Sequence, residues 1–365
     1  MTRLSIELRY ALSIGVPLLA ALTLTPVVAR LARRTGILDL PSAGKAHLQP
    51  TPYMGGVAVA AGFTSIGAVA AGPSGQLLVI LLCAVAIGAL GLVDDWRTVR
   101  PGPKLLVEAA AGVALWVVGV RAGLFGVAPL DLMLTVAWVI LVTNSLNLLD
   151  NMDGLLSGVA AISALTFFAI AAGRGYYLVA SLALAIAGAC LGFLRHNFPP
   201  ARIFLGDAGS LMIGFLLAAL GLKLDLVGED GLLRAAIPLL CLGVPLLDTA
   251  LVILARWRDG RPIYRGGTDH SSHRLATLGL SDRQVALVNY GAQACFSSLA
   301  VWLALSSGGS TGLAVAVTAP ISVAALVLLL RAPIPAVAPA PITTTHADIE
   351  TTGESARAER PTTPH

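Results

Sequence analysis

The chain has 365 residues, of which 56% are apolar and only 12% are charged, and its formal net charge is +4. Soluble domains carry about 25% charged residues, so this composition excludes a secreted disulfide scaffold, a disordered regulator and a nucleic-acid-binding domain, although the pI is near 9.0. Ten or eleven spans of roughly 20 residues account for the apolar fraction and for a mean hydropathy of +0.82. The composition predicts a polytopic membrane protein.

Apolar runs between charged residues and Pro/Gly breaks predict about eleven transmembrane helices, and ten is the alternative because the eighth run is short. Lipid tolerates only helices or closed barrels, and the runs lack strand alternation, so the predicted fold class is an all-α integral membrane protein. The first run continues past Pro17, which predicts a retained span rather than a signal peptide. The predicted spans are 8–29, 54–72, 75–93, 104–122, 128–148, 154–173, 176–194, 208–222, 232–254, 283–306 and 311–331.

Basic residues predict the orientation of these spans. Of the 24 Lys and Arg residues, 18 fall on one side of the predicted membrane. The positive-inside rule places that side in the cytoplasm. We therefore expect a cytoplasmic (inner) membrane protein with its N-terminus outside and its C-terminus in the cytoplasm. The basic side comprises the loops 30–53, 94–104, 144–153, 195–207 and 255–283 and the tail after 331.

The chain divides into two predicted parts. Residues 1–331 form one transmembrane catalytic domain, and residues 332–365, rich in Pro, Thr and Ala, form a disordered cytoplasmic tail. All four cysteines lie in apolar runs without the paired spacing of a zinc or redox site, which indicates packing roles.

The first polar cluster is an acid pair at the end of the third span. Asp94 and Asp95 oppose the helix dipole, which favours cations at a C-terminus. This arrangement favours a divalent-cation or phosphate site, and an exposed pair neutralised by Arg97 and Arg100 is the alternative. Lys104 begins the next helix and would by itself be read as a lysine that extends to the membrane surface.

A second cluster of Asn and Asp residues follows the fifth span. If this segment is helical, one face carries Asn144, Asn147, Asn151 and Gly154, with Asp150 beside them. Because no cation lies nearby, these side chains need a substrate or a metal as partner. An Asn-rich loop closed by an Asp-Gly turn is the alternative.

Two further clusters lie in the next cytoplasmic loops. Asp207 enters an apolar helix between glycines that let a ligand approach the backbone, and a helix N-cap is its bland alternative. His270, His273 and Arg274 lie within one turn; their spacing does not match a zinc site and favours a cationic, hydrogen-bonding grip on phosphate. The alternative for the arginines of this loop is that they serve only to set the orientation of the protein in the membrane.

Carboxylates, amides, histidines and arginines on one membrane face indicate Mg²⁺ with a phosphorylated substrate. No phosphate-binding loop signature accompanies them, which argues against an ATPase. In their order, the four clusters resemble the motifs of the polyprenyl-phosphate N-acetylhexosamine-1-phosphate transferases, which start bacterial glycan synthesis on a lipid carrier. The resemblance covers about residues 8–331 and includes a fifth stretch that begins at Lys45 and ends at Gly56.

This resemblance implies a role for each matching residue. Asp94 and Asp95 match the paired acids that engage lipid phosphate and metal, and Asp207 matches the principal Mg²⁺ ligand. It thus implies Asp94, Asp95 and Asp207 as catalytic residues and Asp207, Asp95 and Asn147 as metal ligands. The implied substrate-binding residues are Lys45, Lys104, Asn147, Asp150, Asp153, Asn197, Phe204, His270, His273 and Arg274.

Two positions depart from the family pattern. Tyr53 stands where the family often has Arg, which puts a phosphate contact there in doubt. Asn151 stands where the family often has Gly, and we expect Asn151 to keep a left-handed turn, which Asn tolerates better than other residues.

The implied reaction is Mg²⁺-dependent transfer of N-acetylhexosamine-1-phosphate from a UDP-sugar to polyprenyl (undecaprenyl or decaprenyl) phosphate, releasing UMP; Mn²⁺ is the alternative ion. The sister enzyme for phospho-MurNAc-pentapeptide has three consecutive histidines. The separated His270 and His273 therefore resemble the branch that uses UDP-N-acetylglucosamine. Expected partners are these substrates and membrane lipid, without nucleic acid, and a homodimer is left open. A phospho-MurNAc-pentapeptide or other amino-sugar transferase and, more remotely, a lipid or sugar transporter are the alternatives.

Overall fold

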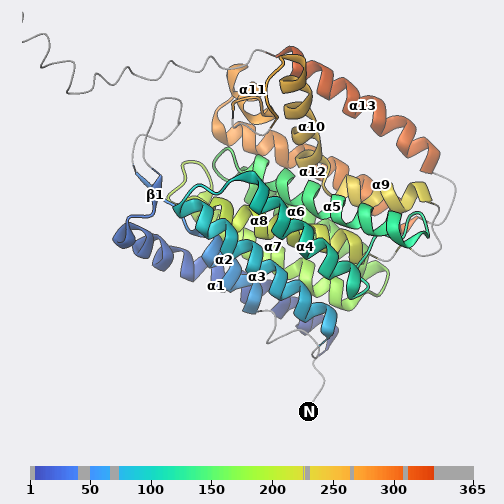
Figure 1. The fold of residues 1–365 in the computed structure, drawn as a ribbon, viewed down its shortest axis with the longest axis horizontal. Helices are drawn as coiled ribbons and strands as arrows, with labels where there is room; N and C mark the ends of the chain where they lie inside the picture. Colours follow the sequence, from blue (N-terminus) through green and yellow to red (C-terminus); the bar gives the residue numbers. More distant parts are fainter. Residues whose placement is uncertain are drawn as a thin grey trace, which may run out of the picture.

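The computed structural model describes residues 5–39, 50–65, 74–224, 226, 231–263, 267–306 and 311–332. Over these ranges the chain is almost entirely helical, as predicted (Figure 1). The helices are α1 (Ile6–Thr35), α2 (Gly55–Thr64), α3 (Gly75–Trp96), α4 (Pro101–Val117), α5 (Ala128–Leu149), α6 (Leu155–Gly173), α7 (Tyr177–Asn197), α8 (Gly206–Lys223), α9 (Gly231–Cys241), α10 (Gly243–Arg258), α11 (Ser271–Thr277), α12 (Asp282–Leu305) and α13 (Thr311–Arg331). Lys45 and nearly all of the predicted tail lie outside the described residues.

Helix α8 lies at the centre of the bundle and packs against α2, α3 and α5 (Figure 1). A helix that is apolar on all sides is expected to be buried, and almost every residue of α8 is. The outer helices instead expose large apolar side chains such as Leu19, Leu82 and Met133, which are 58%, 59% and 68% exposed. This combination of a packed centre and an apolar surface is what a membrane protein requires.

Glycines let the backbones of α1 and α7 approach closely. A Cβ atom added to Gly188 would lie 2.3 Å from the carbonyl oxygen of Ile14, and one on Gly192 would lie 2.3 Å from that of Leu18. Small residues at such contacts are typical of helix packing in membranes. The pairing advances in the same direction along both helices, so α1 and α7 run parallel.

The polar loops gather at one end of the bundle, which we call the site end. There the last residues of α3, α5 and α7 meet the first residues of α4, α6 and α8. Lys104 at the start of α4 contacts Asp94 at the end of α3, and Asn147 near the end of α5 contacts Asp207 at the start of α8. A two-residue antiparallel pair, β1 (Leu38–Asp39) and β2 (Thr51–Pro52), is the departure from all-α structure.

The predicted span 232–254 is not one straight helix. It is divided into α9 and α10, which meet at an angle of 85°. Backbone groups freed at such a break must find partners inside a membrane protein. The buried side chain of Gln293 on α12 supplies them: its Nε2 donates to the carbonyl oxygen of Cys241 at 3.0 Å, and its Oε1 accepts from the N–H of Val244 at 3.0 Å.

Six helices among the described residues are long and apolar enough to cross a membrane, or seven when the bent α9–α10 pair is counted as one span. The predicted span 54–72 is helical only over α2, and residues 66–73 lie outside the described residues. The chain is therefore a multi-pass membrane protein, and the count of eleven stays a prediction.

Candidate active site

Lys104 links two of the predicted acids. Its ammonium group contacts Asp94 Oδ2 and lies 2.8 Å from Asp207 Oδ2. Asp94 also accepts the backbone N–H of Val99, which fixes the carboxylate at the start of the loop. Asp94 therefore pairs with Lys104; Arg97, which the alternative reading pairs with the acids, lies over the ring of Trp96 at 4.8 Å.

Asp207 is held from a second direction by α5. The amide of Asn147 donates to Asp207 Oδ1 at 2.9 Å and to Ser210 Oγ at 2.9 Å. The side chain of Asp207 remains 29% exposed. Its oxygens bind side chains of α4 and α5, so Asp207 is not simply a cap of its own helix. Together, Asp94, Lys104, Asn147 and Asp207 form what we call the acid–lysine cluster.

Asp95 has a different environment from its neighbour Asp94. One oxygen accepts the N–H of Asp207 at 2.7 Å and the other accepts the N–H of Ala208 at 3.1 Å. These are free donors of the first turn of α8, which a helix N-terminus leaves without intrahelical partners. Gly206 has φ +74°, and a Cβ there would lie 2.5 Å from Asp95 Oδ2. Asp95 thus caps α8 from another helix and sets the position of Asp207.

A buried carboxylate below the cluster was not among the sequence candidates. Glu108 lies one turn after Lys104 on α4, is fully buried and accepts a hydrogen bond of 2.6 Å from Asn144. Its Oε1 has no partner among the described residues. An ionisable residue within an apolar helix is itself a functional signal, and that signal could have identified Glu108.

The loop between α5 and α6 is not helical, so the predicted shared face ends early. Helix α5 ends at Leu149. Asn144 and Asn147 lie on this helix, whereas Asn151 and Gly154, which were predicted to share its face, lie beyond its end. Nor does Asn151 adopt a left-handed turn, because Met54 is the one described non-glycine residue with positive φ; Gly154 takes this conformation instead. The expectation for Asn151 is therefore wrong.

The two acids of this loop, Asp150 and Asp153, have different environments. Asp153 Oδ2 accepts the N–H of Ala201 at 2.7 Å and so binds the loop that precedes α8. Burial raises the pKa of Asp150 well above its ordinary value, and the negative charges of Asp207 and Asp95 raise it further. A proton or a bound cation on Asp150 would therefore be favoured.

Asn197 holds the loop before α8 in place. It is buried, and its Oδ1 accepts the N–H of Gly154 at 3.0 Å while its Nδ2 donates to the carbonyl oxygen of Ile203 at 3.1 Å. The ring of Phe204 lies 5.8 Å from that of Tyr53. Burial and the neighbouring carboxylate of Asp39 raise the pKa of Tyr53, so this phenol stays neutral.

The histidine loop is fixed by a buried acid that the sequence analysis also missed. His270 Nδ1 lies 2.8 Å from Asp248 Oδ2 on α10, and Asp248 Oδ1 accepts the N–H of Ser271 at 2.7 Å. The ring of His273 lies 5.9 Å from that of His270. The hydroxyl of Ser272 donates to Asn151, which ties this loop to the loop between α5 and α6.

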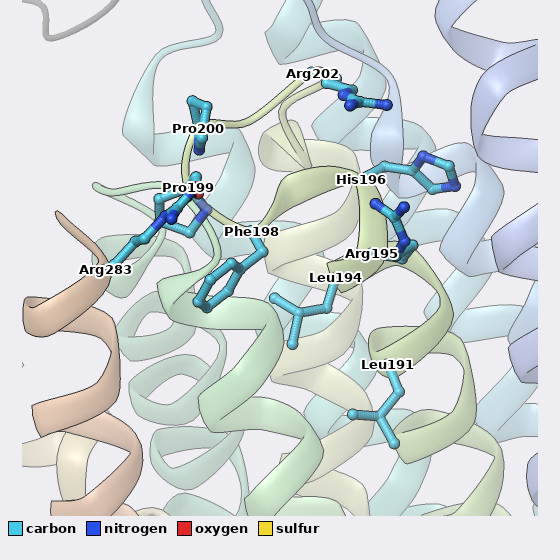
Figure 2. Close-up of a pocket in the computed structure, with 9 residues that line it drawn as sticks. All are labelled: Leu191, Leu194, Arg195, His196, Phe198, Pro199, Pro200, Arg202 and Arg283. Atoms are coloured by element: carbon cyan, nitrogen blue, oxygen red, sulfur yellow. Dashed lines mark hydrogen bonds between the residues drawn. The ribbon is translucent and has the colours of Figure 1, made fainter.

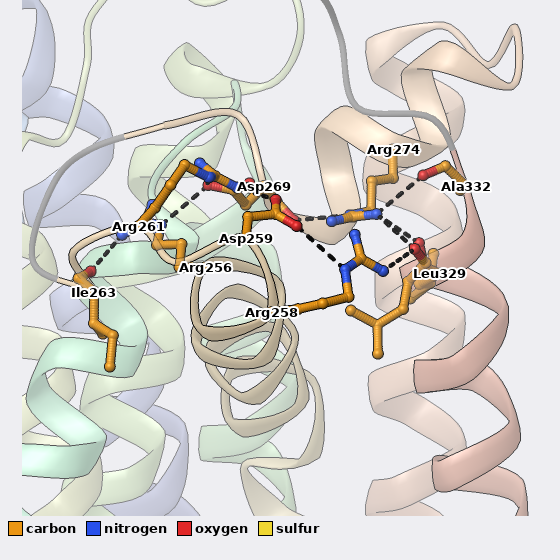
Figure 3. A network of polar contacts seen from close by, with 10 residues as sticks. Arg256, Arg258, Asp259, Arg261, Ile263, Asp269, Arg274, Leu329 and Ala332 are labelled. Atoms are coloured by element: carbon orange, nitrogen blue, oxygen red, sulfur yellow. Dashed lines mark hydrogen bonds and ion pairs between the residues drawn. The ribbon is translucent and has the colours of Figure 1, made fainter.

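Arg274 contacts the end of α13 and the backbone of Asp269 rather than a residue of the acid–lysine cluster. It is fully buried, and its Nη1 donates to the carbonyl oxygens of Leu329 at 2.9 Å and Ala332 at 3.0 Å, at the end of α13 (Figure 3). In the same network, Asp269 accepts hydrogen bonds from Arg256 and Arg261. The geometry indicates that Arg274 holds the end of α13 in place. This role depends on contacts between distant segments of the chain, so the sequence motif does not reveal it.

The structure thus brings the predicted residues into three groups. The acid–lysine cluster is centred on Asp207, with Asp95 behind it. Asp153, Asn197 and Phe204 lie around the loop before α8, and the two histidines lie at the N-cap (His270) and in the first turn (His273) of α11. No group of three or more His, Cys, Asp or Glu side chains converges as a ready metal cage within the described ranges. Mg²⁺ does not need such a cage, because one or two carboxylates, water and substrate phosphates complete its shell.

Comparison with known proteins gives consistent matches. Residues 77–225 match the model of glycosyl transferase family 4. The chain is 34% identical over 316 residues to the probable undecaprenyl-phosphate N-acetylglucosaminyl 1-phosphate transferase of Bacillus subtilis, covering 82% of this chain and 88% of the relative.

Two further relatives have names that give a different lipid phosphate or a different sugar group. The decaprenyl-phosphate N-acetylglucosaminephosphotransferase of Mycobacterium tuberculosis is 33% identical, covering 73% of this chain and 75% of the relative. The phospho-N-acetylmuramoyl-pentapeptide-transferase of Moorella thermoacetica is 34% identical, covering 77% and 92%. Identity alone therefore does not distinguish the two kinds of donor.

Proposed function

Because the chain belongs to the polyprenyl-phosphate sugar-1-phosphate transferases of glycosyl transferase family 4 and is a multi-pass membrane enzyme, we propose that it transfers N-acetylglucosamine-1-phosphate from UDP-N-acetylglucosamine to polyprenyl phosphate. UMP is the second product, and the lipid-linked sugar starts a cell-envelope glycan. The observation that carries this proposal is the ammonium group of Lys104 between Asp94 and Asp207.

The main physical problem of the reaction is the approach of two anions. A lipid phosphate must reach the diphosphate of the donor, and catalysis of phosphoryl transfer depends chiefly on positioning and on neutralising charge. Lys104 provides a cation at the junction of α3, α4 and α8, and the partly exposed Asp207 leaves this junction open to a ligand.

The residues present fit Mg²⁺, with Mn²⁺ as the alternative ion. Their donors are carboxylate and amide oxygens, the hard ligands that Mg²⁺ prefers. Asp207 would hold the ion, and Asn147 would join it through its amide oxygen only after its amide turns from the geometry in which Nδ2 donates to Asp207. Asp95 acts mainly by fixing the first turn of α8, on which Asp207 stands. When bound, the ion supplies positive charge to the donor diphosphate.

Asp94 is assigned to the acceptor. By analogy with phosphoserine, a lipid phosphate has a second pKa of about 6, so most of it is already dianionic at neutral pH. Asp94, held by Lys104 and by the N–H of Val99, then orients this phosphate or accepts its last proton. A strong general base is not required.

The net chemistry is an exchange of phosphoanhydrides. An oxygen of the lipid phosphate bonds to the phosphorus that carries the sugar, and the bond from that phosphorus to the bridging oxygen breaks. UMP leaves with that oxygen and its electron pair. Because one phosphoanhydride replaces another, the reaction needs no ATP.

We assign the UDP-sugar donor to the region beside the acid–lysine cluster where the loop between α5 and α6 contacts the loop before α8. Asp153, Asn197 and Phe204 surround the loop before α8, and we assign this region to the nucleotide. In this proposal His270 and His273, at the start of α11, lie near the phosphates of the donor. Lys45 stays a proposed donor contact on the basis of its motif alone.

Membrane placement follows from the substrates. The polyprenyl chain needs lipid, whereas the UDP-sugar is water-soluble, so we place the site end at the cytoplasmic face of the cytoplasmic membrane. The bias of Lys and Arg supports this orientation. A transporter would instead place charged groups near the membrane midplane, whereas the acid–lysine cluster lies at helix ends.

The test is a transfer assay with purified full-length protein, undecaprenyl phosphate and Mg²⁺. Radiolabelled UDP-N-acetylglucosamine and UDP-MurNAc-pentapeptide are supplied separately, and label is followed into lipid while UMP is measured in water. We expect label from UDP-N-acetylglucosamine, lost with EDTA. Label from the pentapeptide donor alone would keep the chemistry but overturn the proposed sugar, and no transfer from either donor would contradict the proposal.

A further inference from the structure

A second polar feature lies at the site end, outside the acid–lysine cluster. Three arginines surround a hollow of about 510 Å³ beside the end of α7 (Figure 2). Arg195 comes from α7, Arg202 from the loop before α8, and Arg283 from the start of α12. None of the described residues that line this hollow, which we call the arginine pocket, is acidic.

The guanidinium groups remain available to a ligand. Arg283 donates from Nε to the carbonyl oxygen of Pro199 at 2.8 Å, which fixes it at one edge of the pocket. The side chains of Arg195 and Arg202 are exposed and make no hydrogen bond or ion pair with a described residue. Three cations around one concave surface, with no acidic residue among the described residues that line it, create a strong local preference for an anion.

The floor of the arginine pocket is apolar. Leu191, Leu194 and Phe198 line it, and Leu191 is 36% exposed on the outer side of α7 (Figure 2). Leu191 lies one helical turn before Arg195 on α7 and is therefore farther from the site end of the bundle. The pocket therefore continues from a cationic rim onto an apolar, outward-facing surface, which suits an amphiphile better than a small soluble anion.

The arginine pocket is separate from the proposed substrate groups. Asn197 turns inward and binds Gly154 and Ile203, and Asp153 binds the N–H of Ala201 from the inner side of the same loop. The pocket and the proposed nucleotide site thus share a stretch of backbone between them but no side chain.

We propose that the arginine pocket binds the phosphate head group of an anionic phospholipid from the surrounding membrane leaflet, with its acyl chains along the outer face of α7. Basic pockets between helices on the cytoplasmic side are suited to such head groups. The proposal goes beyond the transfer reaction and rests on the orientation given under the proposed function. A bound lipid would lie against residues 198–202, which also contact the donor region.

Retention of lipid by the purified full-length protein tests this proposal without using turnover. The protein in mild detergent is incubated with phosphatidylglycerol or phosphatidylcholine, and bound lipid is counted by native mass spectrometry. We expect phosphatidylglycerol to be retained in preference to phosphatidylcholine. The variant R195Q/R202Q/R283Q should retain roughly tenfold less phosphatidylglycerol or lower, because each basic group contributes to binding at an anionic surface.

A matched variant separates the pocket from general positive charge. R30Q/R33Q/R34Q removes three exposed arginines at the end of α1 and should retain as much phosphatidylglycerol as the unmodified protein. Equal loss in both triple variants, or no head-group preference, overturns the proposal. Should the pocket triple fail to fold, the single variants R195Q and R202Q replace it.

A soluble competitor distinguishes the lipid from its phosphate alone. Glycerol 1-phosphate in large excess should leave phosphatidylglycerol bound, because it lacks the chains that contact α7. Full displacement would show that the pocket recognises free phosphate and would overturn the assignment to lipid. A protein that retains phosphatidylglycerol but transfers no sugar would contradict only the proposed function.

Discussion

The acid–lysine cluster and the histidine loop are both rich in charged residues, yet they use these residues differently. In the cluster, side chains from separate helices contact one another, and Asp207 remains 29% exposed. In the histidine loop, Arg274 and Asp269 are fully buried, and Arg274 donates to backbone carbonyl oxygens. The acid–lysine cluster therefore keeps charged groups accessible to a ligand, whereas the charged groups of the histidine loop stabilise the fold.

This difference separates motif membership from function. Asp94 and Asp95 are adjacent in one motif, but Asp94 pairs with Lys104 while Asp95 caps α8. Arg274 follows His273 directly, but it is committed to α13. Substitutions in the cluster should therefore reduce turnover, and those in the supporting contacts should reduce stability.

The largest expected effect is on turnover, from removal of the Lys104 charge. K104M leaves Asp94 and Asp207 without their shared cation and should lower the transfer rate by about 1,000-fold, the upper range for loss of one charge-stabilising donor. The initial rate of label transfer measures it. K223M removes a lysine at the opposite end of α8 and should leave the rate within about twofold; a K104M rate equally close to normal would remove Lys104 from the chemistry.

Arg274 should matter for stability rather than for donor binding. R274A leaves a void and carbonyl oxygens without donors, and it should lower the free energy of unfolding by roughly 3 kcal/mol. R258A is the matched control, since Arg258 is 53% exposed although it also reaches the end of α13, and it should cost less than about 0.5 kcal/mol. Detergent-phase unfolding measures both; a stable R274A protein with a raised KM would return Arg274 to the donor site.

Asp95 offers a sharper test because its neighbour serves as control. D95A removes the acceptor of two N–H groups at the start of α8 and should lower stability by about 1–2 kcal/mol, the range for a lost helix cap. D94A should lower the transfer rate with a smaller change in thermal stability. If D95A unfolds at the same temperature as the unmodified protein, Asp95 is not a brace for α8.

The smallest effect concerns pH and His273. Burial lowers the pKa of this imidazole below its ordinary value, and the nearby His270 lowers it further. The stability due to neutral His273 is therefore present above the unfolded pKa and is lost as the pH falls through the lower folded value.

We expect the unfolding temperature to decline between pH 7 and pH 5 by a few degrees less in H273Q than in the unmodified protein, a shift on the order of that caused by 1 kcal/mol. Thermal unfolding at both pH values measures the difference. Identical declines would mean that His273 does not titrate as its burial requires.

Sequence patterns located the polar clusters and most helices because both depend on local signals. Apolar runs mark α3, α5 and α7 closely, and an acid at the end of an apolar helix, such as Asp207, is easy to recognise because its burial is costly. The roles of Asp95, Arg274 and Gln293 depend on contacts between segments far apart in the chain. No local pattern encodes those contacts, so the α9–α10 bend and the two bracing roles could not be predicted.

The central claim is that the acid–lysine cluster carries the transfer, and Asp207 tests it most directly. UMP release from UDP-N-acetylglucosamine is measured with purified D207N protein, undecaprenyl phosphate and Mg²⁺, beside D282N, which changes an exposed aspartate of α12. We predict background UMP release from D207N with an unfolding temperature close to that of the unmodified protein, and full release from D282N. Full turnover by folded D207N would contradict the account.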